Sequence, residues 1–335
     1  METIGLFGLQ VYPYGAAVAL AAAVALCLAG LLTRHDAPSR AALSYFAVLA
    51  VPLGLACARL GYIAVSIDWV LQEGAGFFFR FREGGFLLYG AMGGCLVAAW
   101  LACRVTKAPL ARFLDRISVP GMLLIALCRL AEGLCGVGYG WSVEEWFLEG
   151  NGMSLIALDD PALLCRFPFA ALDYYGAWNW AVFVLEALVA LGVMIAATRV
   201  RVRRDGGRFA LCLLLYCCTQ VLCESLRQDA VLRWGFVRVN QIIGAVLTVL
   251  LLIAFIRLNG RSSAGSIARS AAGLVGGALL VIAMEFALEG KISVIEWMTM
   301  DVCYCVMACG CALMIASVMR FWRSAFCGEE KEASA

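Results

Sequence analysis

Two residues of opposite charge lie three positions apart at the end of a long apolar run. Arg129 and Glu132 belong to the segment CRLAEGLCGVGYG, and the run before them is long enough to cross a membrane. Charges at that depth are costly, so they usually mark a functional site. The glycines that follow allow the backbone to leave the helix and approach a polar ligand, which a bilayer tolerates only beside a protein-lined cavity. The segment therefore predicts a polar binding site.

A second pair has the same spacing. Glu224 and Arg227 follow a later apolar run. The planar guanidinium of arginine binds phosphate oxygens bidentately, so Arg129 and Arg227 are the natural residues to hold a phosphate. In the alternative interpretation, each glutamate only neutralises the arginine of its own pair. Glu186, in the middle of another apolar run, also needs a partner, and the nearest plausible ones are Arg129 and Arg227.

The composition is that of a membrane protein. Apolar residues make up 63% of the 335 residues and charged residues 15%, and the apolar residues occur in blocks. A window of about 20 residues identifies apolar spans near residues 12–32, 43–66, 86–103, 117–137, 180–198, 209–226, 238–257, 271–288 and 298–320. The sequence therefore predicts an all-α integral membrane protein, with a bundle of seven spans and two additional transmembrane helices at the C-terminus.

The basic residues predict an orientation. Most of the 26 lysines and arginines fall in the loops after spans one, three, five and seven and in the C-terminal tail. Such residues are retained in the cytoplasm, so we expect the N-terminus outside and the C-terminus inside. The run TRVRVRRDGGR at 198–208 is most simply an anchor beside anionic headgroups. The acidic and aromatic loop at 138–179 then lies outside, as a functional loop or an interfacial aromatic belt.

A polar stretch divides the chain. The segment NGRSSAGSIARS predicts a linker at 259–270, between a seven-span domain at 1–258 and an appended unit of two helices and a cytoplasmic tail at 271–335. We expect the seven-span domain to fold without the appended helices. The small-residue run GLVGGALL at 273–280 favours the alternative, in which these helices pack closely against the bundle.

Composition also disfavours several kinds of site. Most of the 16 cysteines lie within apolar runs, where they act as small apolar side chains, and His35 is the only histidine. We therefore expect no metal site and no cofactor. The net charge of +2 is too small to indicate a nucleic acid as partner.

Several segments, in order over about residues 10–258, resemble the prolipoprotein diacylglyceryl transferase family. These integral membrane enzymes transfer diacylglyceryl from phosphatidylglycerol to a lipobox cysteine. The segments are VYPYG with Tyr14, ARLGYIAV with Arg59, REGGFLLYGAMGG with Tyr89, CRLAEGLCGVGYG with Arg129, CESLRQDA with Glu224 and Arg227, and RVNQIIG with Gln241.

The resemblance implies roles for these residues. It places Tyr14, Tyr89 and Glu132 at the reacting centre, and it assigns phosphatidylglycerol binding to Arg59, Arg129, Glu224, Arg227 and Gln241. The base that accepts the thiol proton would be Glu132 or Glu224, and Tyr89 is a poor one because the pKa of a tyrosine is about 10. Arg59 has a second interpretation, in which it binds carbonyl groups of a neighbouring span.

The chain also departs from the family pattern. Tyr89 stands where the family has a histidine, Glu132 and Cys135 replace two asparagines, and Val137 replaces a glutamate. Two hypotheses follow. In the first, the chain is a diacylglyceryl transferase of the bacterial plasma membrane, with phosphatidylglycerol, prolipoprotein signal peptides and membrane lipids as partners. In the second, it is a catalytically impaired relative that binds anionic lipid or acts as a scaffold. A transporter is disfavoured because no inverted repeat is visible.

Overall fold

A computed structural model describes residues 4–6, 9–80, 84–148, 153–156, 158, 160–228, 232–234, 237–260, 263–291 and 298–327. In this part of the chain, nine helices are long and apolar enough to cross a membrane. They are α1 (Pro13–Thr33), α2 (Ala37–Val65), α4 (Leu88–Thr106), α5 (Leu110–Glu132), α7 (Val182–Arg199), α8 (Gly207–Leu226), α9 (Val239–Asn259), α10 (Ala264–Leu288) and α11 (Met300–Phe326). The predicted all-α membrane bundle is confirmed.

The shorter elements connect the long helices. They are β1 (Ile4–Leu6), β2 (Leu9–Val11), α3 (Ile67–Glu73), η1 (Ala75–Phe79), η3 (Gly133–Cys135), α6 (Val143–Trp146), η4 (Pro161–Leu163), β3 (Ala170–Leu172), β4 (Trp178–Trp180), β5 (Arg233–Trp234) and β6 (Val237–Arg238). The strands pair as antiparallel hairpins, β1 with β2, β3 with β4 and β5 with β6.

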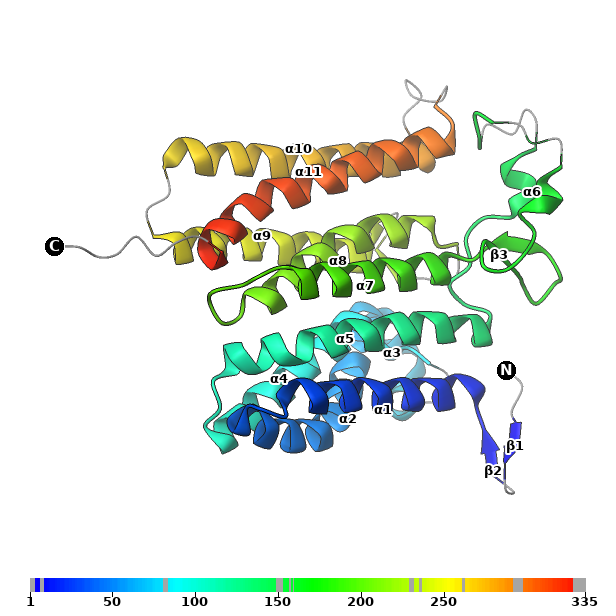
Figure 1. Cartoon of the computed structure of the whole chain (residues 1–335). Helices are drawn as coiled ribbons and strands as arrows, with labels where there is room; N and C mark the ends of the chain where they lie inside the picture. The colour runs from blue at the N-terminus through cyan, green and yellow to red at the C-terminus, as the bar shows by residue number, and fades with distance from the viewer. Residues whose placement is uncertain are drawn as a thin grey trace.

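The two ends of the bundle differ. One end, called the loop end here, carries the β1–β2 hairpin, α6 and β3, and α11 ends at the other end (Figure 1). That other end carries the connections at 104–112 and 199–208 and is called the arginine-rich end. The predicted outer loop at 138–179 therefore contains short elements of its own, among them α6 and the β3–β4 hairpin.

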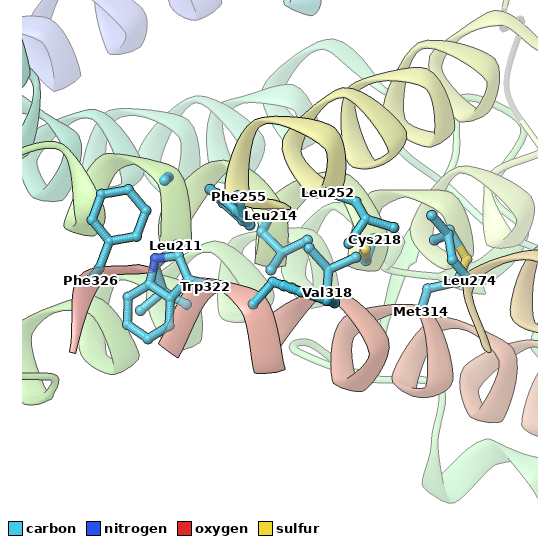
Figure 2. Close-up of a cluster of buried hydrophobic side chains, with 12 residues drawn as sticks. Leu211, Leu214, Cys218, Leu252, Phe255, Leu274, Met314, Val318, Trp322 and Phe326 are labelled. Carbon is cyan, nitrogen blue, oxygen red and sulfur yellow. The ribbon is translucent and has the colours of Figure 1, made fainter. Parts of the chain in front are cut away.

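Helix α8 lies at the centre of the bundle. It contacts α5 and α7 on one side and α9 and α11 on the other. The appended helices share its apolar core: Leu211 and Leu214 of α8 pack with Val318 and Trp322 of α11 in one buried cluster (Figure 2). The small-residue run at 273–280 packs along α11, the other appended helix, and not closely against the seven-span bundle.

The predicted linker is shorter than 259–270. Helix α9 continues to Asn259 and α10 begins at Ala264, so the second half of the polar stretch is helical. The reason is a helix cap, since the Ser263 side chain accepts a hydrogen bond from the backbone N–H of Ser266. Hydrogen bonds also hold the appended helices, from Trp322 Nε1 to the Gly207 carbonyl (2.9 Å) and from Asn259 Nδ2 to the Phe321 carbonyl (3.0 Å). Independent folding of residues 1–258 stays a prediction.

Candidate functional site

Four charged side chains from three helices meet near the loop end. Arg129 and Glu132 come from the last turn of α5, Glu186 from the second turn of α7, and Arg227 directly follows α8. Arg129 binds Glu132 at 2.7 Å and Glu186 at 3.5 Å. Arg227 binds Glu132 at 2.9 Å and Glu186 at 3.0 Å. Each carboxylate thus bridges both guanidinium groups, and we call these four residues the paired cluster.

The paired cluster is almost removed from solvent. The side chain of Glu186 is 1% exposed and that of Glu132, the most open of the four, is 16% exposed. Two positive and two negative charges cancel, which is the condition under which ions are tolerated inside a membrane protein. Gln220 of α8 adds a hydrogen bond from its Nε2 to Glu186. The cluster is therefore a neutral, hydrogen-bonded unit that fixes α5, α7 and the end of α8 relative to one another.

The partners expected for Glu186 are the ones observed, whereas the pairing of Glu224 with Arg227, the alternative interpretation, is not. Helix α8 ends at Leu226, and Arg227 has an extended backbone with ψ of 137°. Because i,i+3 pairing requires both residues to be helical, Arg227 turns away toward Glu132 and Glu186. Glu224 instead accepts a hydrogen bond from Asn240 Nδ2 at 2.7 Å.

The glycine-rich turn after α5 brings Glu132 to α7. Gly138 has φ of 82°, and its carbonyl accepts a hydrogen bond from the N–H of Phe183 at 2.9 Å. A Cβ on Gly138 would lie 2.8 Å from Phe183 Cβ and 3.2 Å from the Glu132 carboxylate. Glycine is required there because both the left-handed conformation and the close approach exclude a side chain. The turn therefore docks on the first residues of the helix that carries Glu186.

The other candidate residues lie at different distances from the paired cluster. Tyr14 is exposed on the first turn of α1, close enough to Glu132 and Arg129 to interact with their charges. Tyr89 is buried against α8 and α9, beside Cys217. Among the described residues, its hydroxyl has no hydrogen-bond partner of normal geometry. Tyr14 thus lies beside the ions, whereas Tyr89 lies on the side of α8 that faces α9.

Arg59 and Gln241 make structural contacts. Arg59 donates from Nη1 to the carbonyls of Gly84 (2.6 Å) and Gly85 (3.1 Å) and from Nη2 to that of Phe77 (2.5 Å). The second interpretation expected carbonyls of a neighbouring span, and the observed acceptors lie instead in the connection between α2 and α4, which Arg59 organises. Gln241 donates from Nε2 to the Val221 carbonyl at 3.0 Å and to the carboxylate of Glu285 in α10.

Sequence reasoning missed two residues of the site. Gln220 binds Glu186, and the Tyr216 hydroxyl lies beside Arg129. A signal for Gln220 was present, because an amide four residues before Glu224 in an apolar helix must face a polar partner. Among the described residues, no group of three or more histidines, cysteines or carboxylates has the arrangement of a metal site.

The sequence of this chain is similar to those of known proteins. A sequence model described as prolipoprotein diacylglyceryl transferase matches residues 2–257. The phosphatidylglycerol–prolipoprotein diacylglyceryl transferase of Symbiobacterium thermophilum is 29% identical over 249 residues, covering 72% of this chain and 85% of that protein. Proteins of the same name from Listeria welshimeri and Mycobacterium leprae are 24% and 27% identical, each over 72% of this chain and over 83% and 77% of their own lengths.

Proposed function

The chain belongs to the prolipoprotein diacylglyceryl transferase family, and from this premise we propose that it transfers diacylglyceryl from phosphatidylglycerol to a prolipoprotein cysteine. The cysteine sulfur forms a bond to the glyceryl carbon that carries the phosphate. The bond between that carbon and the phosphate oxygen breaks, and glycerol phosphate leaves with one additional negative charge. The proton of the thiol passes to a protein base.

The convergence of Arg129 and Arg227 carries this proposal. They come from α5 and from the end of α8, and both bind the same two carboxylates within 3.5 Å. Two guanidinium groups that share two carboxylates can equally share the oxygens of one phosphate. Because the leaving phosphate gains charge in the transition state, such cations stabilise the transition state more than the bound substrate.

The carboxylates occupy the positions that the phosphate would take. Phosphatidylglycerol must therefore displace at least one of them, and Glu132 is the better candidate because its side chain is 16% exposed whereas that of Glu186 is 1% exposed. Glu132, once displaced, is a carboxylate beside the bound headgroup and serves as the base for the thiol. Glu186 remains and keeps the two guanidinium groups at a fixed separation. In this mechanism, substrate binding and release of the base are one event.

The same proposal includes an orientation. With the N-terminus outside, the paired cluster faces the outer leaflet of the bacterial plasma membrane, and the arginine-rich end faces the cytoplasm. The exposed Tyr14 beside the cluster then lies where a lipobox signal peptide would approach from the membrane. The distribution of lysine and arginine supports this orientation, and cysteine accessibility at Arg166→Cys, in a background without Cys165, would test it. If this cysteine were labelled only from the cytoplasmic side, the orientation of the protein in the membrane would be the reverse of the one proposed.

Complementation tests the function. The chain is expressed in a bacterium depleted of its own transferase, and lipoprotein maturation is followed by the mass of a reporter lipoprotein. We expect the diacylglyceryl mass increment with the wild-type chain and none with Arg129→Ala. Because Tyr89 replaces the family histidine and is buried, a catalytically impaired lipid-binding protein is the alternative. Binding of phosphatidylglycerol without any mass increment would establish that alternative and reject the transferase.

A further inference from the structure

A second group of charges surrounds a cavity at the arginine-rich end. The cavity has a volume of about 330 Å³ and lies between the first turns of α5, the α7–α8 connection and the start of α8. Its charged lining residues are Arg112, Arg116, Arg204, Arg208, Asp115 and Asp205. Four guanidinium groups outnumber two carboxylates, so this cavity is positive where the paired cluster is neutral.

The two carboxylates of the cavity already have partners. Asp115 accepts hydrogen bonds from the backbone N–H of Gly206 at 2.7 Å and of Phe209 at 2.8 Å, and so caps the start of α8. Asp205 forms a salt bridge with Arg112 at 3.1 Å, with both side chains about half exposed. Within the described part of the chain, this is the one ion pair among the lining residues, and the charge of Asp115 also acts on Arg208. The four arginines still outnumber the two carboxylates, so the cavity keeps a net positive charge that can attract an anion.

Two of the arginines lie deeper. Arg116 reaches across to donate from Nη1 to the Leu32 carbonyl of α1 at 3.2 Å. Arg208 is partly buried, and its Nε is enclosed without a hydrogen-bond acceptor among the described residues. A buried N–H donor without an acceptor is energetically unfavourable. An oxyanion bound beside Arg208 would accept this hydrogen bond and compensate the positive charge. The deep side of the cavity thus favours binding of an anion.

A smaller cavity adjoins the first. Its volume is about 160 Å³, and it shares Asp115, Arg116 and Arg208 with the charged cavity. The rest of its lining includes Leu32 of α1 and Val119 of α5, on helices that are apolar enough to span the membrane. The combined space is therefore charged on the side of the connection and apolar on the side of the bilayer. A free phosphate ion would use only the charged part.

We propose that these two cavities bind the phosphate group of an anionic phospholipid, with the carbon atoms next to the headgroup in the apolar cavity. Basic pockets at the ends of membrane helices bind anionic headgroups in this way, through charge-assisted hydrogen bonds from arginine. On the orientation proposed above, the lipid belongs to the cytoplasmic leaflet. The site lies at the opposite end of α8 from Arg227 and does not depend on the transfer reaction.

The test is a titration of the purified full chain in detergent with fluorescent phosphatidic acid, followed by fluorescence anisotropy. The double variant Arg204→Gln/Arg208→Gln removes two lining charges. Its matched control, Arg201→Gln/Arg203→Gln, removes two exposed charges of the same connection that do not line the cavity. We expect affinity to fall by about tenfold in the first variant and by less than about twofold in the control. Arg204→Gln alone, at an exposed side chain, is expected to give an intermediate loss even if the double variant folds poorly.

Competition separates the sources of phosphate. Unlabelled phosphatidic acid should displace the probe, whereas inorganic phosphate at the same concentration and zwitterionic phosphatidylcholine should not. Both double variants leave the loop end unchanged, so probe bound there contributes equally to both and does not affect the difference in affinity between them. An equal loss of affinity in the two double variants would mean that general surface charge causes the binding, and it would overturn the proposal. Displacement by inorganic phosphate as effective as by lipid would overturn the assignment to a phospholipid.

Discussion

Both ends of α8 carry arginines and carboxylates. Their charges cancel at one end and leave a net positive charge at the other. At the loop end, Arg129 and Arg227 are matched by Glu132 and Glu186, and each arginine lies within 3.5 Å of both carboxylates. At the arginine-rich end, Asp115 binds backbone N–H groups instead of an arginine. The comparison shows that the ratio of arginines to carboxylates, two to two at one end and four to two at the other, decides whether a site is neutral or positive at rest.

This difference predicts different responses to an anion. The paired cluster must exchange a carboxylate for a phosphate, so its net charge changes little when substrate binds. The cavity at the arginine-rich end has no such exchange to make, so its affinity should fall steeply with ionic strength.

Removing one arginine of the paired cluster should have the largest effect. We expect Arg129→Ala or Arg227→Ala to lower the transfer rate by at least about 100-fold, because one cation on the developing phosphate charge is lost. The loss of a charge-assisted hydrogen bond of about 1.5–3 kcal/mol should also abolish measurable headgroup binding at the paired cluster. Arg→Lys should recover only part of the rate, because lysine lacks the planar fork.

The measurement is transfer of labelled diacylglyceryl from phosphatidylglycerol to a lipobox peptide. Arg166→Ala, which removes an exposed arginine at the same end, is the control and should retain full activity. Wild-type lipid binding by either paired-cluster variant would reject the assignment of the two arginines.

Glu132→Gln should eliminate transfer while preserving the fold and lipid binding. Glutamine has the shape of glutamate but cannot accept the thiol proton. Melting temperature and phosphatidylglycerol binding report the first two properties, and the peptide assay reports the third. Glu144→Gln, an exposed change in α6, is the matched control. If Glu132→Gln turned over at the wild-type rate, another group would have to be the base.

Glu186→Gln should make the paired cluster resemble the arginine-rich cavity. The cluster would carry a net positive charge, so we expect affinity for phosphatidic acid to rise, by up to about tenfold. Stability should fall by about 3 kcal/mol or more, because a nearly fully buried ion pair is broken. Anisotropy and thermal melting of the same sample measure the two effects. Unchanged melting together with unchanged affinity would mean that Glu186 does not set the charge of the site.

Truncation after Asn259 should have the smallest effect on transfer. Lipid can cover the apolar faces that α8 and α9 lose, so we expect the chain of 1–259 to insert and to retain activity within about tenfold of the parent. The Trp322 bond to the Gly207 carbonyl is lost at the start of α8, so lipid binding at the arginine-rich end should weaken more. Aggregation or rapid proteolysis of the truncated chain would show instead that the appended helices belong to the core.

The sequence predicted the spans well because each is a block of apolar residues separated by charged connections. It also predicted the partners of Glu186, since few opposite charges lie within the membrane. It left the partners of Glu224 and Arg227 open, because their pairing depends on whether α8 continues beyond Leu226. From the sequence, residues 198–208 are interpreted only as a basic anchor. The cavity forms only when the folded protein brings Arg112 and Arg116 to the α7–α8 connection, and a sequence pattern does not show that contact.

The pairing of the four ions also has a consequence for biosynthesis. Arg129 and Glu132 neutralise each other on one helix, so α5 can enter the bilayer without waiting for later segments. Glu186 has no such partner within α7, and Arg129 is already paired with Glu132 at 2.7 Å and lies 3.5 Å from Glu186. The closer partner of Glu186, Arg227 at 3.0 Å, reaches it only after α8 has been synthesised. We therefore expect α7 and α8 to leave the translocon together as a helical hairpin. Glycosylation mapping of nascent chains should find α7 poorly inserted when synthesis stops at residue 204 and fully inserted when it stops at residue 260.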